Sequence, residues 1–164
     1  MTIKTFEDLF LHMLRDVLYA ERRILRALPK MARKAKSAEL KQAFEHHHSQ
    51  TEDQIERLEK VFEEINQPPR GVKCEAIIGL IEEAEDQMDE ISDPEVLDAA
   101  MLASAQAVEH YEISRYGTLI AYAKRLGYSQ NLLSLLGATL DEEKQTDVTL
   151  TKLAESRINP KAAA

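Results

Sequence analysis

The feature that most constrains the fold is a set of long helical segments, each with an apolar seam that polar residues interrupt near its middle. By a seam we mean apolar residues that recur every three or four positions, which is typical of helices that pack against other helices. Helix breakers are rare, since the 164 residues include five Gly and five Pro. The composition, rich in Ala, Leu, Glu and Lys, also favours helix over sheet. We therefore predict an all-α protein.

Start and stop signals give bounds for the helices. Thr5 and Asp8 form a capping signal at the first helix, and Pro94 suits the first turn of a later one. The segment NQPPRG and Gly127 are expected to end helices. The expected helices span about residues 5–35, 38–65, 74–91, 94–126 and 129–157, followed by a frayed tail at 158–164.

The spacing of these helices predicts how they are connected. Tight turns near residues 37 and 128 join the long helices into two antiparallel hairpins. About 27 residues, which include the short helix, separate the hairpins, and this is enough to cross the length of a bundle. We expect a ferritin-like four-helix bundle with a long crossover that carries a short extra helix. It is expected to form a single domain over residues 1–164.

Charge and hydropathy exclude several classes of partner. The formal net charge of −8 disfavours nonspecific binding to nucleic acid or to an anionic membrane. No apolar run is long enough to span a bilayer, and the first residues lack the pattern of a signal peptide. The lone Cys74 cannot form an intramolecular disulfide, which fits a reducing compartment. We therefore expect a cytoplasmic protein with no nucleic-acid or membrane partner.

The polar interruptions bring carboxylates and one imidazole into the seams. Glu109 and Glu112 are three residues apart and share a helix face, which the phase of the neighbouring apolar residues turns inward. Counted from the two expected turns, most of the interruptions lie at similar heights, with His47 as the outlier. The residues that this phase turns inward are Glu21, His47, Glu109, Glu112, Glu143 and Asp147.

Five carboxylates in a core need positive charge, and the seams contain no Lys or Arg. An unpaired buried carboxylate is costly or else takes up a proton. One or two divalent metal ions are the simplest source of the charge, and oxygen ligands with one imidazole suit Fe or Mn, with Zn as a further candidate. We expect Glu21 and Glu143 as terminal ligands and one of Glu109 and Glu112 as a bridge. The remaining ligands are expected to be His47, Asp147 and the other glutamate of the pair.

Three more residues are expected to support these ligands: Gln50, Gln54 and Tyr116. Tyr116 can also be interpreted as a core residue with one hydrogen bond. A single polar residue in a seam is usually a satisfied core group, and Glu21 alone would be such a case. Interruptions in all four long helices are harder to explain in that way. The other histidines, among them His110, are expected at the flank or surface.

Several segments, in this order, resemble one known family: YAERRILRALPKMA, HHSQTEDQIERLE, VKCEAIIGLIEEA, VEHYEISRYGTL and LDEEKQTDVTLTKLA. The chain resembles, over nearly its whole length, the YciF/YciE-like family of bacterial ferritin-like stress proteins, a domain of unknown function. The resemblance implies a rubrerythrin-like or ferritin-like bundle, a homodimer and a dinuclear metal site, but no assigned reaction. The family usually reads His-x-x-Glu-Thr where this sequence has Gln50 in place of the Glu. This change removes one negative charge and is expected to weaken one metal position.

These observations favour a stress-related protein that handles an oxidant or a metal at an iron or manganese centre. Dioxygen or peroxide is the expected small-molecule substrate, and whether the protein is an enzyme stays open at this point. A mineral cage is disfavoured, because no further helix is expected after the last helix of the four-helix bundle to build cage contacts. The alternative is a non-enzymatic stress or interaction module with a structural or vestigial metal, which Gln50 keeps open.

Overall fold

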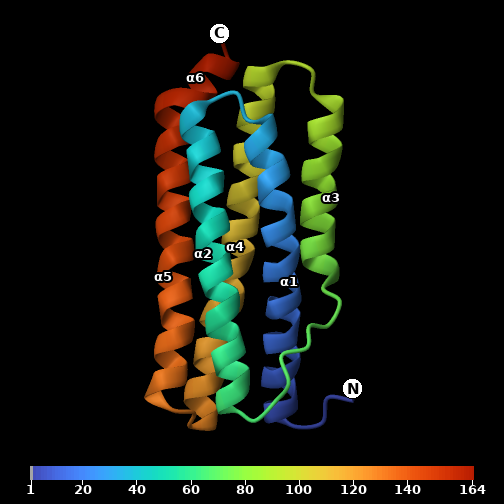
Figure 1. Cartoon of the computed structure of the whole chain (residues 1–164), viewed down its shortest axis with the longest axis vertical. Helices are drawn as coiled ribbons and strands as arrows, with labels where there is room; N and C mark the ends of the chain where they lie inside the picture. Colours follow the sequence, from blue (N-terminus) through green and yellow to red (C-terminus); the bar gives the residue numbers. More distant parts are fainter. Residues whose placement is uncertain (1) are drawn as a thin grey trace.

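The computed structural model describes residues 2–164, and within this range the chain is helical and contains no strand. The long helices lie side by side along the molecule (Figure 1). They are α1 (Phe6–Lys34), α2 (Ala38–Glu64), α4 (Pro94–Leu126) and α5 (Gln130–Leu153). The shorter α3 (Glu75–Glu90) packs against α1 and α4. The predicted all-α fold is therefore confirmed, and the observed starts of these helices lie within about one residue of the predicted ones.

Local signals fix the helix ends. Thr5 and Asp8 form a capping box, in which each side chain accepts a hydrogen bond from the backbone of the other residue. Asp93 accepts hydrogen bonds from the first backbone N–H groups of α4, with Pro94 at the start of that helix. Gly127 ends α4 in the left-handed conformation, at a φ of 74°, which glycine adopts without strain.

The two hairpin turns lie at opposite ends of the bundle. In Figure 1 the α1–α2 turn is at the top and the α4–α5 turn is at the bottom. The crossover through α3 returns the chain to the top, so α2 and α4 run in the same direction. Each long helix contacts two others, because α1 and α5 each pack against both α2 and α4. Among residues 2–164, no helix is both long enough and apolar enough to cross a lipid bilayer.

A polar layer divides the apolar core into two clusters. The lower cluster includes Phe10, Phe62 and Leu132, and the upper cluster includes Leu40 and Met101. On α2, α4 and α5 buried polar side chains separate the residues of the two clusters, and on α1 Glu21 lies at the boundary between them. The interrupted seams of the sequence thus correspond to a single polar level inside the bundle.

The tail differs from the prediction. Instead of fraying at residues 158–164, the chain continues through a π-helical turn, η1 (Ala154–Ile158), into α6 (Asn159–Ala162). Ile158 is only 2% exposed and belongs to the upper apolar cluster. The apolar Ile158 anchors the tail, and a prediction based on its polar and small neighbours overlooks that contact.

One buried carboxylate outside the polar layer joins the two hairpins. Asp98 of α4 is 3% exposed and accepts hydrogen bonds from the backbone N–H groups of Lys36, at 2.9 Å, and Ser37, at 2.7 Å. Both donors lie in the α1–α2 turn. Hydrogen bonds to a charged group contribute about 1.5–3 kcal/mol each, so Asp98 is a major stabiliser of that turn.

Replacing Asp98 tests this contact. Asp98→Ala is expected to lower the free energy of unfolding by about 2–4 kcal/mol, because one buried and one partly buried N–H group lose their acceptor. Urea denaturation followed by circular dichroism measures the change. The control is Glu95→Ala, which removes only an exposed ion pair with Lys36 and is expected to cost far less. An equal loss of unfolding free energy in both variants would show that the hydrogen bonds to Asp98 contribute no more than the exposed ion pair.

Candidate metal centre

The polar layer places four glutamates and one histidine from the four long helices at the centre of the bundle. Glu21 comes from α1, His47 from α2, Glu109 and Glu112 from α4, and Glu143 from α5. None of these residues is more than 4% exposed. All five side chains therefore point into the core, as their helix phase predicted.

We call these five residues the central group, and four of them form a compact cluster. One ligand atom from each of His47, Glu109, Glu112 and Glu143 lies within 4.8 Å of the others. His47 Nε2 is 3.2 Å from Glu109 Oε1 and 3.9 Å from Glu143 Oε2. Opposite ligands of one ion lie about 4.2 Å apart when the bonds are about 2.1 Å long. Small side-chain shifts would therefore allow the group to surround a divalent ion.

Seven buried polar atoms of the central group lack a hydrogen-bond partner among residues 2–164. They are both ring nitrogens of His47, both carboxylate oxygens of Glu112, and the Oε2 atoms of Glu21, Glu109 and Glu143. Native proteins satisfy about nine in ten buried polar groups, so such a concentration at one level calls for an explanation. Carboxylate oxygens and an imidazole that converge at one level form a ligand set that a cation can use. The residues present thus fit a metal ion such as Fe or Mn.

Burial also determines the protonation of the group. Loss of hydration raises the pKa of Glu21, Glu109 and Glu112 well above the ordinary value, and repulsion between neighbouring carboxylates adds to the shift. Burial lowers the pKa of His47, although Glu143 and the Gln50 amide act in the opposite direction. In the metal-free protein these shifts favour a neutral imidazole and protonated carboxyl groups, and a cation would displace the protons.

Two of the predicted supporting residues contact the carboxylates directly. The Gln54 amide donates a hydrogen bond to Glu143, and the Tyr116 hydroxyl donates one to Glu21. Both side chains are fully buried. These contacts fix the orientation of one carboxylate on α5 and one on α1. The third residue, Gln50, is half-buried near His47, and its Oε1 has no hydrogen-bond partner in the described part of the chain.

The sequence pattern missed a positive charge next to the layer. Arg57 Nη2 lies 2.6 Å from Glu142 Oε1, and its Nη1 donates to the Thr139 hydroxyl at 2.8 Å. The charge of Arg57 acts to lower the pKa of Glu21, although burial outweighs it. Arg57 is off the seam of α2, and its long side chain reaches Thr139 on α5. The periodicity of α2 and α5 contains no signal of this contact.

Asp147 lies apart from the central group. Its side chain is 21% exposed, accepts a hydrogen bond from Gln106 at 3.0 Å, and lies 3.2 Å from Nε2 of the exposed His110. Asp147 is one helical turn beyond Glu143 towards the top of the bundle. Its role as a ligand stays a prediction.

The heights predicted for the polar residues were measured from the wrong reference points. The count treated the two turns as one level, although they lie at opposite ends of the bundle (Figure 1). His47 therefore belongs to the group despite being counted as an outlier. Correct heights require knowing that the two hairpin turns lie at opposite ends of the bundle, which the sequence did not show.

Known proteins resemble this chain in sequence and in fold. Residues 5–163 match the family described as a domain of unknown function, DUF892. The chain belongs to this family. The match includes all the residues of the central group, so the polar layer lies inside the DUF892 domain.

Two relatives of this DUF892 chain support the same conclusion. Protein YciF of Escherichia coli K12 is 48% identical over 163 residues, which are 99% of this chain and 98% of YciF. The crystal structure of this E. coli stress protein has a TM-score of 0.90 at 47% identity, covering 96% of this chain and 99% of that one. YcfI from Rhodopseudomonas palustris, assigned provisionally as a structural protein, has a TM-score of 0.89 at 52% identity, with 91% and 94% covered. The helical bundle is therefore shared over nearly the whole DUF892 chain.

The raised pKa values predict an unusual dependence of stability on pH. A carboxyl group whose pKa is higher in the folded state binds its proton more tightly there, so its stabilising effect is lost as pH rises through the folded pKa. In excess chelator, the melting temperature of this DUF892 protein is expected to fall as the pH rises above 4.5, the ordinary value for these carboxyl groups. Differential scanning fluorimetry across this range measures the trend.

A neutral substitution at the centre supplies the matched test. Glu112→Gln, which removes one titrating group without changing its shape, is expected to flatten the pH dependence. Glu56→Gln, at an exposed position of α2, is the control and should keep the slope of the original chain. A melting temperature that rises steadily with pH in all three proteins would contradict this account of the central carboxylates.

Proposed function

We propose that the chain is a stress-related metal protein whose central group holds two divalent iron or manganese ions and handles an oxidant or the metal itself. The observation that carries this proposal is the set of buried ligand atoms on four helices that have no hydrogen-bond partner within residues 2–164. Charge supports the number of ions. Glu21, Glu109, Glu112 and Glu143 carry up to four negative charges, which two divalent ions would neutralise.

Each ligand has a proposed position. Glu21 and Glu143 would each offer one carboxylate that a hydrogen bond already orients. Glu109 and Glu112 would supply further carboxylate oxygens, and neutral His47 would supply a nitrogen. Asp147 would join only after releasing Gln106 and His110. When bound, iron or manganese in such a centre supplies redox chemistry toward dioxygen or peroxide.

The surrounding side chains protect and orient the centre. The apolar clusters above and below the layer exclude water, which strengthens electrostatic interactions inside it. Burial and the nearby Glu21 carboxylate raise the pKa of Tyr116 well above its usual value, so its phenol keeps a proton to donate. Tyr116 thereby holds one carboxylate oxygen of Glu21 and leaves the other, Oε2, free for a cation.

A second candidate function has its own support. Arg57 brings positive charge to the edge of the layer, and Gln50 is neutral where the resembling family usually has Glu. Both features reduce the positive charge that a metal ion would have to supply. Together with the provisional assignment of YcfI as a structural protein, they favour a non-enzymatic stress or interaction module with a structural metal.

Metal content tests the proposal. Protein purified without chelator is expected to carry about one to two equivalents of Fe or Mn, measured by elemental analysis. The Glu109→Ala, Glu112→Ala double variant is expected to lose this metal, because it removes two of the four clustered ligands. Glu56→Ala, Glu59→Ala is the control, since it removes two exposed glutamates with the same spacing. Protein that stays metal-free after reconstitution with Fe and Mn would refute the proposed centre.

The same samples separate the two candidate functions. A redox centre should consume dioxygen or peroxide with a suitable reductant, and the double variant should not. A structural metal should raise the melting temperature without any turnover, since a ligand that binds only the folded state stabilises it. This second result would select the interaction module.

A further inference from the structure

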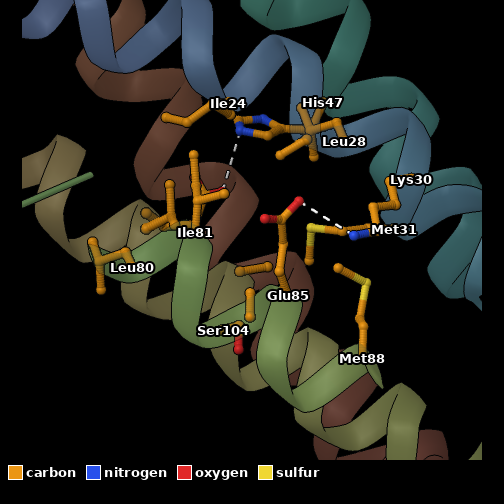
Figure 2. A pocket seen from close by; sticks show the side chains of 15 residues that line it. Ile24, Leu28, Lys30, Met31, His47, Leu80, Ile81, Glu85, Met88 and Ser104 are labelled. Carbon is orange, nitrogen blue, oxygen red and sulfur yellow. Dashed lines mark hydrogen bonds and ion pairs between the residues drawn. The ribbon is translucent and has the colours of Figure 1, made fainter. Parts of the chain in front are cut away.

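A narrow, mainly apolar pocket connects the surface with the central group. It lies between α1, α3 and α4 and has a volume of about 40 Å³ (Figure 2). Its inner end is lined by His47 and Glu109, two members of the central group. In Figure 2 His47 lies next to Ile24 and Leu28 of α1. The side chains of the wall between the two ends include Ile24, Leu28, Ile81, Ala84, Ala105 and Val108.

The outer end of the pocket is at the surface and is polar. Lys30 of α1 and Glu85 of α3 form an ion pair at 3.3 Å, with side chains 38% and 43% exposed. Figure 2 shows this pair beside Met31. The hydroxyl of Ser104, also in the lining, donates to Gln87 at 3.0 Å and so already has a partner. The pocket is thus polar at its two ends and apolar along its walls.

Size and polarity restrict what can occupy this pocket. One water molecule needs roughly 10–15 Å³ of such space, so 40 Å³ admits a molecule of only a few atoms. A water or hydrogen peroxide molecule that enters apolar walls gives up hydrogen bonds, which costs free energy. Dioxygen has no such bonds to lose. Apolar cavities in proteins stay dry and bind apolar probes such as xenon.

We infer that this pocket is the entry route and binding site for dioxygen, and that it selects dioxygen over hydrogen peroxide. The inference rests on the proposed function and adds to it the oxidant and the path by which it reaches the centre. The specificity comes from the contact of α3 with α1 and α4, which encloses the apolar walls next to His47.

Xenon tests the pocket without any metal. Crystals of the metal-free protein, exposed to xenon under pressure, are expected to show xenon between Ala84 and Val108. Ala84→Phe fills this space from α3 and is expected to abolish the xenon site. Ala76→Phe is the control, because Ala76 is exposed on the same helix and does not line the pocket. Absence of xenon from the pocket of the unsubstituted protein would overturn the inference, whatever the variants do.

The oxidant preference is tested with the iron-loaded protein. Two ferrous ions give up one electron each, and either dioxygen with two protons becomes hydrogen peroxide, or hydrogen peroxide with two protons becomes two waters. Ala84→Phe is expected to slow ferrous oxidation by dioxygen about tenfold or more, and oxidation by peroxide less than about twofold. Equal slowing with both oxidants would overturn the proposed selectivity, and so would no slowing with either. Ala84→Leu repeats the comparison with a smaller side chain if the phenylalanine prevents folding.

The two experiments fail separately from the proposed function. Iron binding without xenon in the pocket overturns only the dioxygen route. Xenon in the pocket of a protein that takes up neither Fe nor Mn refutes the metal centre, and with it the assignment of dioxygen as oxidant. Xenon binding with a selective loss of the dioxygen reaction supports both.

Discussion

The structure depends on neutralising negative charge inside an apolar bundle. Four glutamates occupy one level of the core, and hydration is not available to them there. Isolated carboxylates in such surroundings cost many kcal/mol, so each must hold a proton, face a cation or receive donors. The two apolar clusters, the hydrogen bonds from Gln54 and Tyr116, and the proximity of Arg57 are all arranged around this requirement.

The same residues therefore link stability to ligand chemistry. Protons and metal ions compete for one set of oxygen atoms, and neither can be changed without altering the energy of the core. A bundle with a purely apolar centre would be simpler to stabilise. This chain instead keeps Glu21 and Glu143 fully buried, at a cost in stability. Residues retained at such a cost usually serve a function.

The sequence predicted well those features that short-range signals determine. The helix starts follow from Thr5 and Asp93, and the inward direction of Glu109 and Glu112 follows from the apolar residues beside them. The sequence did not predict the contacts between distant segments. Arg57 reaches the layer through the length of its side chain, and Asp147 lies apart from the group in contact with Gln106 and His110 of α4. These are properties of the assembled helices, which periodicity within one helix does not contain.

Asp98 has a consequence for how the protein is made. The turn between α1 and α2 is closed by an acceptor that lies more than 60 residues later in the chain, as the sequence separations of 61 and 62 show. During synthesis from the N-terminus, the first hairpin emerges before this carboxylate exists. The nascent hairpin thus carries two unpaired backbone donors and an uncovered apolar face until the start of α4 leaves the ribosome. Completion of the first half of the molecule has to wait for the second half.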